Sequence, residues 1–249
     1  MNDKIKNPMV LGIITARGGS KGIPEKNIKD LCGQPLIAYT IKTAQDSGVF
    51  DRLILSTDDQ KIAEVAKSYG VEVPFIRPAE LAQDDTPHLP VLQHAVSWLK
   101  EKQNYWPDAV MLLQPTAPLR QSCHIKEAIK LFNEKTADSV VSVSEIPGHF
   151  SPYWAVTVDE SGLGKLFINE PIKNRIPRRQ SFPKKNYYHN GAIYLFKIGL
   201  LFDQNEPNFY GNKVALYPMA GKYSVNIDSP DDWLLAETAL AKILAQKSQ

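Results

Sequence analysis

Residues 10–27 read VLGIITARGGSKGIPEKN, and this stretch decides the expected fold. Its first seven residues are almost all apolar and predict a buried strand. Three glycines follow within five residues, and glycine lets a backbone turn tightly and approach a ligand closely. Arg17, Lys21 and Lys26 add positive charge to the loop, and Ser20 adds a hydroxyl. Because exposed backbone N–H groups in such a loop bind anions, the stretch predicts a strand followed by an oligophosphate-binding loop.

The spacing of these glycines argues against two common nucleotide-binding motifs. The P-loop motif has four residues between its glycines and continues with Lys and then Ser or Thr. Here three residues separate Gly18 from Gly22, and Ile23 follows. The stretch also lacks the G-x-G-x-x-G pattern of dinucleotide-binding folds. A P-loop ATPase and an NAD-dependent dehydrogenase are therefore disfavoured.

Downstream of the loop, apolar runs alternate with segments of helical periodicity. Strands are expected at residues 10–16, 52–57, 71–77, 109–114, 139–143, 191–196 and 223–227. Helices are expected at residues 35–46, 60–69, 87–102, 122–135 and 230–245. Strands that are almost wholly apolar and alternate with helices predict an α/β fold with a mainly parallel sheet and helices on both faces. Ligands bind beyond the carboxyl ends of such strands, which favours the loops after Ala16, Thr57 and Gln114 as site loops.

The pattern changes between residues 146 and 187. Prolines at five positions separate short strand-like pieces there, at residues 154–158 and 164–167. This punctuation predicts an inserted lobe of hairpins at about 146–187 rather than further strand–helix units. We therefore expect one α/β domain over residues 1–249 with a small lobe inserted in it.

The composition is that of an ordinary globular protein. The 249 residues include 29 Lys+Arg and 27 Asp+Glu, which gives a net charge of +2. Nucleic-acid-binding proteins usually carry a larger basic excess, so no nucleic-acid partner is expected. The apolar run at residues 9–15 is too short for a membrane span or a secretory leader. Because Cys32 and Cys123 match neither a disulfide framework nor a zinc site, we expect a cytoplasmic protein with reduced thiols and no membrane partner.

The glycine-rich loop resembles the opening motif of the acylneuraminate cytidylyltransferases, which make CMP-sialic acids and related CMP-nonulosonates. That family has a strand followed by A-R-x-x-S-K-G-x-x-x-K-N, and residues 16–27 read ARGGSKGIPEKN. Further segments agree with the family in the same order: residues 56–58 (STD), 77–81 (RPAEL), 113–120 (LQPTAPLR), 190–194 (NGAIY) and 226–228 (NID). The resemblance therefore covers nearly the whole chain.

This resemblance implies a fold, a reaction and partners. The family fold is a Rossmann-like α/β domain with a smaller dimerisation lobe, which would correspond to residues 146–187. The implied reaction joins CMP from CTP to the anomeric 2-hydroxyl of an acidic nine-carbon sugar and releases pyrophosphate, with Mg²⁺ as cofactor. The expected partners are CTP, a sugar of the N-acetylneuraminate or legionaminate type, and a second copy of the chain in a homodimer.

The family motifs also imply which residues bind the nucleotide. Arg17, Ser20 and Lys21 would hold the triphosphate, and Arg77 matches an arginine that contacts the cytosine or the ribose. The complete expected nucleotide site is Ala16, Arg17, Gly18, Ser20, Lys21, Lys26, Asn27 and Arg77. Arg17, Lys21 and Asp228 are the expected catalytic residues, because phosphoryl-type transfer depends mainly on positioning and on neutralising the leaving group.

Metal and sugar residues are implied in the same way. Asp228 matches a metal-binding aspartate, and Asn226 stands where the family commonly has a second aspartate. An amide oxygen can coordinate Mg²⁺ or hold a water, but it brings no charge. Arg179 lies in a run with six basic residues, 173–185, and would approach the sugar carboxylate from its own or the partner subunit. The expected sugar-binding residues are Gln114, Arg179, His189 and Tyr194.

Two other functions stay open at this point. One is a nucleotidyltransferase for a different sugar, either a Kdo-like eight-carbon acid or a sugar 1-phosphate. The other is a non-catalytic nucleotide-binding module, which the amide of Asn226 in place of a carboxylate favours.

Overall fold

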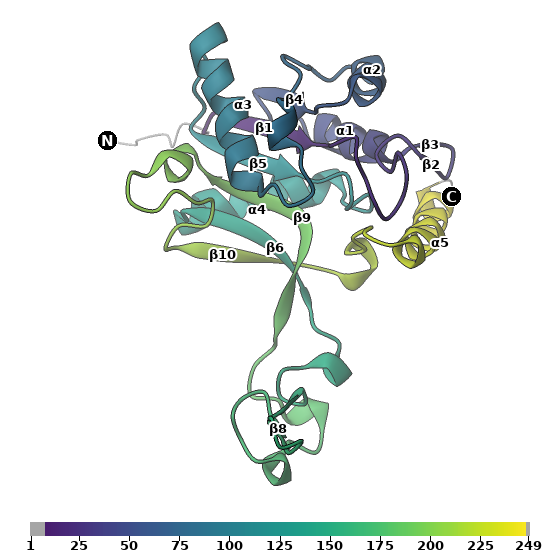
Figure 1. The fold of residues 1–249 in the computed structure, drawn as a ribbon, viewed down its shortest axis with the longest axis vertical. Helices are drawn as coiled ribbons and strands as arrows, with labels where there is room; N and C mark the ends of the chain where they lie inside the picture. The colour runs from purple at the N-terminus through teal and green to yellow at the C-terminus, as the bar shows by residue number, and fades with distance from the viewer. Residues whose placement is uncertain (1–7, 248–249) are drawn as a thin grey trace.

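The computed structural model describes residues 8–247, and within them six strands form the central sheet (Figure 1). The strands lie in the order β10–β6–β9–β5–β1–β4. β1 pairs in parallel with β4 and β5, and β6 pairs in parallel with β10, whereas β9 is antiparallel to both of its neighbours. The expected mainly parallel sheet is therefore confirmed. The strand bounds are β1 (Val10–Thr15), β4 (Arg52–Ser56), β5 (Ala109–Leu113), β6 (Ser139–Glu145), β9 (Tyr187–Lys197) and β10 (Val214–Met219).

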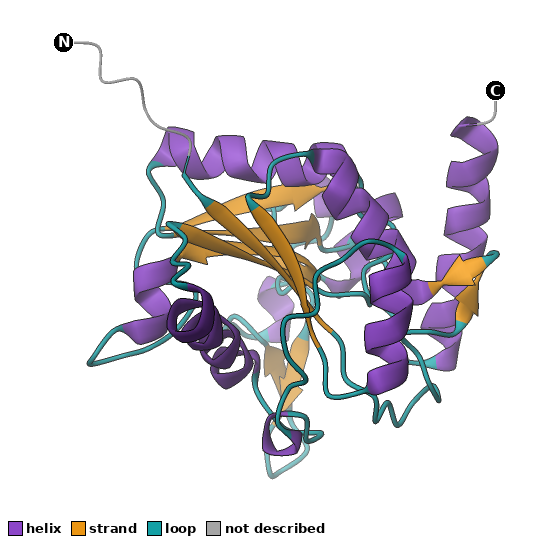
Figure 2. Ribbon diagram, turned by 90° about the horizontal axis from the view of Figure 1, so that it is seen from above, coloured by secondary structure: helices purple, strands orange, loops and turns teal. Residues whose placement is uncertain are grey.

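Helices cover both faces of this sheet, as expected (Figure 2). In β1, Val10 and Ile14 pack on the face covered by α1, α2 and α4, and Leu11 and Ile13 pack on the face covered by α3. Successive strand residues point to opposite faces, so a strand buried on both faces has to be apolar throughout. The helix bounds are α1 (Leu36–Ser47), α2 (Gln60–Ser68), α3 (His88–Gln103), α4 (Ser122–Lys135) and α5 (Pro230–Lys247). No helix described for residues 8–247 is both long and apolar enough to cross a membrane.

The start of α5 fixes the segment that precedes it. Ser229 Oγ accepts the N–H of Asp232 at 3.3 Å, and Asp232 Oδ2 accepts the N–H of Ser229 at 2.8 Å. This reciprocal pair is a capping box, and Pro230 at the first helical position lacks a donor that would otherwise be unpaired. Asp232 Oδ2 also accepts the N–H of Asp228 at 3.1 Å. The cap therefore holds Asp228 at the end of the loop that leads into α5.

Two expected strands are not formed, and one strand of the central sheet was not expected. Residues 71–77 make a single bridge to β4, between Glu72 and Ile54, and Pro74 lacks an N–H to donate. Residues 223–227 begin at the last residue of a 3₁₀ helix and have no strand pairing within the described chain. The sheet edge is formed instead by β10, which contains Pro218 and is exposed at alternate residues. An edge strand tolerates a proline because one side of its backbone needs no partner.

Short elements connect the main ones. β2 (Asp30–Leu31) and β3 (Gln34–Pro35) form a small antiparallel ladder just before α1. The 3₁₀ helices are η1 (Ala79–Leu81), η2 (Gly148–Phe150), η3 (Ile172–Asn174), η4 (Arg179–Ser181), η5 (Ile198–Phe202) and η6 (Gly221–Tyr223).

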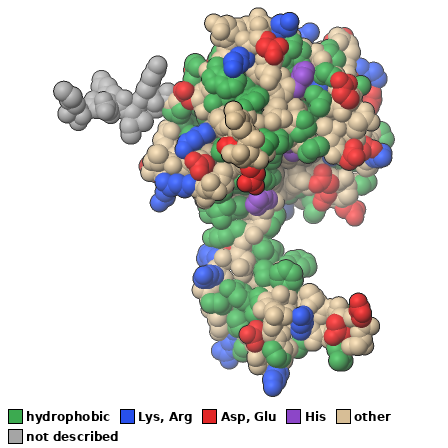
Figure 3. Space-filling view, turned by 60° about the vertical axis from the view of Figure 1, so that its left-hand side comes forward, with side chains coloured by type: hydrophobic (Ala, Val, Ile, Leu, Met, Phe, Trp, Pro, Cys, Tyr) green, Lys and Arg blue, Asp and Glu red, His purple; other side chains and the backbone are tan. Residues whose placement is uncertain are grey.

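Residues 146–186 form a lobe that projects from the body (Figures 1 and 3). β6 and β9 run out of the sheet together and carry the lobe at their far ends (Figure 1). The lobe contains a hairpin of β7 (Val156–Val158) and β8 (Gly164–Leu166). In this fully described segment, Leu166 is the only apolar side chain that is buried. Large apolar side chains are exposed instead: Phe150, Val156, Val158, Leu163, Phe167, Ile168 and Ile172.

Candidate active site

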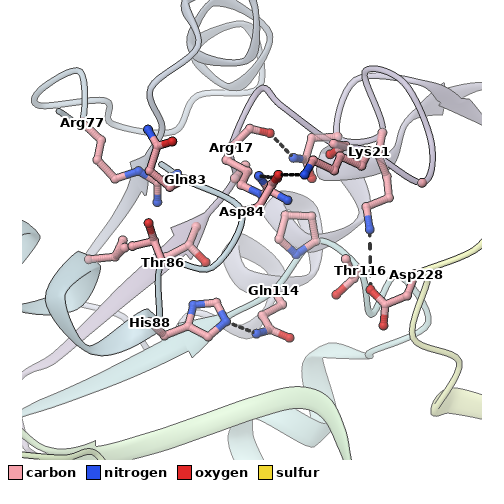
Figure 4. Close-up of a pocket in the computed structure, with 18 of the residues that line it drawn as sticks. Arg17, Lys21, Arg77, Gln83, Asp84, Thr86, His88, Gln114, Thr116 and Asp228 are labelled. Atoms are coloured by element: carbon pink, nitrogen blue, oxygen red, sulfur yellow. Dashed lines mark hydrogen bonds and ion pairs between the residues drawn. The ribbon is translucent and has the colours of Figure 1, made fainter. Parts of the chain in front are cut away.

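A cavity of about 500 Å³ lies beyond the carboxyl ends of β1 and β5 (Figure 4). This is where ligands bind in open α/β sheets. Ten of the residues expected in the site line it: Ala16, Arg17, Ser20, Lys21, Lys26, Asn27, Arg77, Gln114, Asn226 and Asp228. The segment from η1 to the first residue of α3 adds residues that were not expected: Gln83, Asp84, Thr86 and His88. The loops after Ala16 and Gln114 therefore line the cavity together with the loop before α5, whereas the loop after Thr57 contributes no lining residue and reaches the site only through the contact of Asp58 with Arg77.

The loop after β1 closes onto the segment before α5. The side-chain amide of Asn27 donates to the carbonyl of Arg17 at 3.0 Å, and the ammonium of Lys26 donates to the carbonyl of Ile227 at 2.7 Å. A Cβ atom on Gly22 would lie 2.8 Å from the carbonyl oxygen of Asp228, so this close approach requires glycine. Burial lowers the pKa of Lys26, and the nearby carboxylate of Asp228 opposes that shift. The expected nucleotide residue Lys26 therefore also holds the two loops together.

Arg17 and Lys21 converge on one carboxylate. Both side chains form ion pairs with Asp84, from opposite sides of its carboxyl group (Figure 4). Hydrogen bonds from Lys21 and Arg17 hold the pKa of Asp84 below its usual value. Two cations aimed at a single anion form a site for a phosphate group. Asp84 was not singled out in the sequence, although the polar run after residues 77–81 was a signal for a loop at this point.

Arg77 is almost completely buried, with 5% of its surface exposed. Its Nη2 lies 3.4 Å from Oδ1 of Asp58, and the same oxygen accepts the N–H of Gly18 at 3.2 Å. Burial lowers the pKa of Arg77, and the carboxylate of Asp58 opposes that shift. The Nε of Arg77 is buried without a partner in the described chain. Gly18 does not itself line the cavity, but Asp58 connects its backbone to Arg77.

The side chain of Gln114 is oriented by His88. Its Nε2 lies 2.6 Å from Nε2 of His88, and a neutral imidazole can accept the amide N–H at that distance. Burial and the charge of Arg77 both lower the pKa of His88, which favours the neutral ring. A Cβ on Gly191 would lie 3.1 Å from Gln114 Oε1 and 3.3 Å from Asn226 Oδ1. Gly191 has a φ of +71°, so glycine is required for both conformation and space.

Asp228 and Asn226 are the candidate metal ligands. The Nδ2 of Asn226 donates to Oδ2 of Asp228 at 2.6 Å, while Oδ1 of Asn226 is buried without a partner. The described part of the chain has no group of three or more His, Cys, Asp or Glu side chains that could hold a metal ion. Mg²⁺ is often bound by only one or two protein oxygens together with substrate phosphates and water. One exposed carboxylate and an unpartnered amide oxygen beside a phosphate-binding loop fit that requirement.

Three of the expected sugar residues do not line this cavity. Tyr194 and His189 belong to an aromatic cluster with Phe209 and Tyr210, with ring centroids 4.7–6.5 Å apart. Arg179 lines a second cavity of about 510 Å³ at the root of the lobe. Of the sugar residues, the single chain therefore places Gln114 alone in the wall of the main cavity.

Two solved structures share the fold of this chain. A structure described as CMP:2-keto-3-deoxy-manno-octonic acid synthetase complexed with CTP matches with a TM-score of 0.67 and 16% identity, covering 94% of this chain and 99% of the other. The 4-diphosphocytidyl-2C-methyl-D-erythritol synthase from Anaerococcus prevotii matches with a TM-score of 0.64 and 12% identity, covering 95% and 100%. The fold is therefore that of the nucleotidyltransferases.

Sequence comparisons give the family. The model of the family described as "Cytidylyltransferase" matches residues 11–232, so the chain belongs to that family. The CMP-N,N'-diacetyllegionaminic acid synthase of Legionella pneumophila is 33% identical, over 92% of this chain and 94% of the relative. The N-acylneuraminate cytidylyltransferase of Streptococcus agalactiae is 34% identical over 89% of this chain. The chain spans about half of that relative's length, 51%.

Proposed function

We propose that this protein transfers CMP from CTP to the anomeric 2-hydroxyl of a nine-carbon, sialic-acid-like sugar and releases pyrophosphate. The observation that carries the proposal is the convergence of Arg17 and Lys21 on the single carboxylate of Asp84, inside a cavity that Gln114 and Asp228 also line. Family membership and the relatives that act on acidic sugars support the same reaction.

In this mechanism the sugar hydroxyl attacks the α-phosphorus of CTP in line, and negative charge grows on the departing pyrophosphate. Arg17 and Lys21 bind phosphate oxygens in place of the Asp84 carboxylate and neutralise that charge. Ser20 and the N–H groups of the glycine-rich loop add neutral donors. Arg77 contacts the cytosine or the ribose. Catalysis therefore rests on positioning and charge neutralisation, as in other phosphoryl-type transfers.

Asp228 and Asn226 would hold Mg²⁺ beside the triphosphate. When bound, Mg²⁺ supplies further neutralisation of the phosphate charge. The unpartnered Oδ1 of Asn226 and the exposed carboxylate of Asp228 support this assignment. Lys26, 3.6 Å from Asp228 Oδ1, keeps the metal-binding loop against the glycine-rich loop.

The sugar lies on the Gln114 side of the cavity in this proposal. Tyr194 and His189 on β9 do not line the cavity but form an aromatic cluster with Tyr210 of the loop before β10, and in this proposal they would contact the part of the sugar that extends out of it. A legionaminate synthase and an N-acylneuraminate cytidylyltransferase are similar to the chain to nearly the same degree, at 33% and 34% identity. The proposed substrate class includes both kinds of sugar.

The lobe makes the protein a homodimer in this proposal. Its exposed apolar side chains give it a surface that a partner would bury. Arg179 at the root of the lobe would then approach the sugar carboxylate in the partner's cavity, which explains why it is absent from the cavity of its own chain.

The experiment is to incubate the protein with CTP, Mg²⁺ and a panel of nonulosonic acids while pyrophosphate is measured. Release with an N-acetylneuraminate- or legionaminate-type acid is expected, and omission of the acid is the control. Kdo and sugar 1-phosphates, with ATP, GTP and UTP as competing nucleotides, test the alternative transferases. Folded protein that binds CTP and releases no pyrophosphate with any acid would contradict the proposal and favour a non-catalytic nucleotide-binding module.

A further inference from the structure

β5 and β9 separate at the floor of the cavity. Their antiparallel ladder ends at the pair Leu112 and Tyr194. In the same register, Gln114 would lie opposite Ala192. The backbone carbonyls at these two positions therefore lie beyond the ladder. That of Gln114 accepts the N–H of Ala117 at 3.3 Å and the hydroxyl of Thr40 at 3.4 Å, and that of Ala192 needs another donor because buried carbonyls are almost always paired.

The guanidinium of Arg120 fills this gap. Its Nη1 donates to the carbonyl of Ala192 at 2.6 Å and lies 3.4 Å from the carbonyl of Gln114. Its Nη2 donates to Oγ1 of Thr40 on α1 at 2.7 Å. One side chain from the loop before α4 thus joins β5, β9 and α1 below the cavity.

Arg120 is an unusual residue for such a place. It is 1% exposed, and no acidic side chain within residues 8–247 forms an ion pair with it. Burial lowers the pKa of Arg120 to about 9, so the guanidinium stays charged at neutral pH. A buried cation without a counter-ion is costly, and a neutral side chain would avoid that cost if filling space were its only task.

We propose that Arg120 is a positioning residue for the sugar end of the site. Its guanidinium replaces the missing ladder contacts between β5 and β9, and it thereby holds Gln114 and Gly191 where the acid sugar meets them. The backbone carbonyl of Gln114 faces Arg120. The side-chain amide of Gln114 points the other way, toward His88 and the cavity (Figure 4). The catalytic consequence of this inference rests on the proposed function.

The other side of β9 is held without Arg120. The pairing of β9 with β6 changes register between Val141 and Val143, which makes a bulge over residues 190–193. Asn190 Oδ1 accepts the hydroxyl of Ser142 at 2.6 Å and the N–H of Ala192 at 3.2 Å. Replacing Arg120 therefore removes the side-chain link between Ala192 and the end of β5, and it leaves in place both the β6 side and the contacts of Ala117 and Thr40 to the Gln114 carbonyl.

Three variants test the proposal. Arg120→Met keeps much of the side-chain length and removes the charge and the donors. Arg120→Lys keeps the charge and can reach one of the acceptors, so it should rescue part of the loss. Thr43→Val is the matched control, because the Thr43 hydroxyl donates to the backbone carbonyl of Arg120 at 3.2 Å and does not touch the guanidinium.

In Arg120→Met we expect kcat/KM for the acid sugar to fall by about 10- to 100-fold, the size of loss that a small misplacement of a site can cause. KM for CTP should stay near its wild-type value, because the guanidinium does not contact the glycine-rich loop. Amide exchange should rise at Gln114 and residues 190–194 and not in α3. Thr43→Val should match the wild type in each measurement.

If Arg120→Met weakens the kinetic constants for sugar and for CTP equally and also lowers Tm, the proposal is overturned. Wild-type sugar kinetics in Arg120→Met would overturn it as well. If Arg120→Met does not fold, the same comparison is made with Arg120→Lys, in which kcat/KM for the sugar should change more than KM for CTP. If the wild type turns over no acid sugar, the proposed function fails, and the exchange pattern alone then decides the role of Arg120. Unchanged exchange at Gln114 and residues 190–194 would overturn it in that case.

Discussion

The glycine-rich loop and the lobe are both rich in positive charge, and they differ in what surrounds that charge. Arg17 and Lys21 share the carboxylate of Asp84, and Lys26 donates to the carbonyl of Ile227. The six basic residues of 173–185 are all exposed, and in the described chain Lys185, paired with Glu145, is the only one in an ion pair. The loop is therefore satisfied within one chain, whereas the lobe presents most of its charge without a carboxylate.

The apolar side chains differ in the same direction. Ile23 of the loop is buried against α5 in a core that also contains Trp233 and Leu240. In the lobe Phe150 and Phe167 are 69% and 63% exposed. The loop is thus packed within one chain, whereas the lobe exposes large apolar side chains; under the proposed function, one chain would complete the nucleotide end of the site and the sugar end would need a partner that covers the lobe.

The largest effect is expected for Lys21→Ala, which tests whether the loop acts chemically. Loss of one charge-stabilising donor should lower kcat by about 100- to 1,000-fold. The side chain is 80% exposed, so Tm should change little. Pyrophosphate release and thermal unfolding measure the two quantities, and Lys173→Ala on the lobe is the control. Equal losses of activity and stability would mean that the loop is only structural.

The next effect is expected for Phe167→Glu, which tests whether the lobe needs a partner. A charge at this position removes apolar burial worth about 1.5–3 kcal/mol, so dimer dissociation should increase by about 10-fold or more. Analytical ultracentrifugation over a concentration series measures this. Leu234→Glu, an exposed apolar residue on α5, is the matched control and should leave the mass unchanged. If Phe167→Glu has the same mass as the wild type, the exposed apolar surface of the lobe does not hold a partner.

Mixing two inactive variants tests where Arg179 acts. In a heterodimer of Lys21→Ala with Arg179→Ala, one site carries both defects and the other carries neither, if Arg179 works in the partner's site. Random pairing makes about half of the dimers mixed, so about a quarter of wild-type activity should return. No recovery after subunit exchange would place Arg179 in its own chain's site or outside the reaction.

The sequence predicts the nucleotide end well because its signals are local. Glycines, cations and a strand end occur together in residues 10–27, and Ala16, Lys21 and Asn27 all line the cavity. The lobe is also marked by a local signal, because the prolines of residues 146–187 fall between β6 and β9.

The sugar end and the buried supports could not be predicted in the same way. Asp84 matters because a distant loop folds over Arg17, and Arg120 matters because β5 and β9 separate beside it. Both depend on tertiary pairing, which local residue patterns do not contain. β10 was missed because Pro218 and alternate exposure hide an edge strand, whereas the apolar residues at 223–227 pack as a loop.

A smaller effect is expected for Asn226→Asp, which tests whether the nucleotide end is complete with one metal-binding carboxylate. Without metal, a second carboxylate beside Asp228 should cost about 1 kcal/mol of like-charge repulsion. For a protein of this size that corresponds to a decrease in Tm of about 2–4 °C. Mg²⁺ should reverse the decrease, because affinity rises with ligand charge. Thermal unfolding with EDTA and with Mg²⁺ measures both effects. If the Tm of Asn226→Asp does not change when Mg²⁺ is added, Asn226 and Asp228 do not bind the metal.

The smallest effect is expected at His88, behind Gln114, where burial is the main cause of a lowered pKa. The unfolded chain then binds more protons than the folded chain as pH falls through the ordinary histidine value of about 6.5. The contribution of His88 to stability is therefore fully present above that pH and decreases below it. In His88→Gln, which cannot titrate, the free energy of unfolding measured in urea should depend less steeply on pH between about 7 and 5. If the slope stays the same, His88 is not held neutral by its surroundings, and the orientation of Gln114 needs another cause.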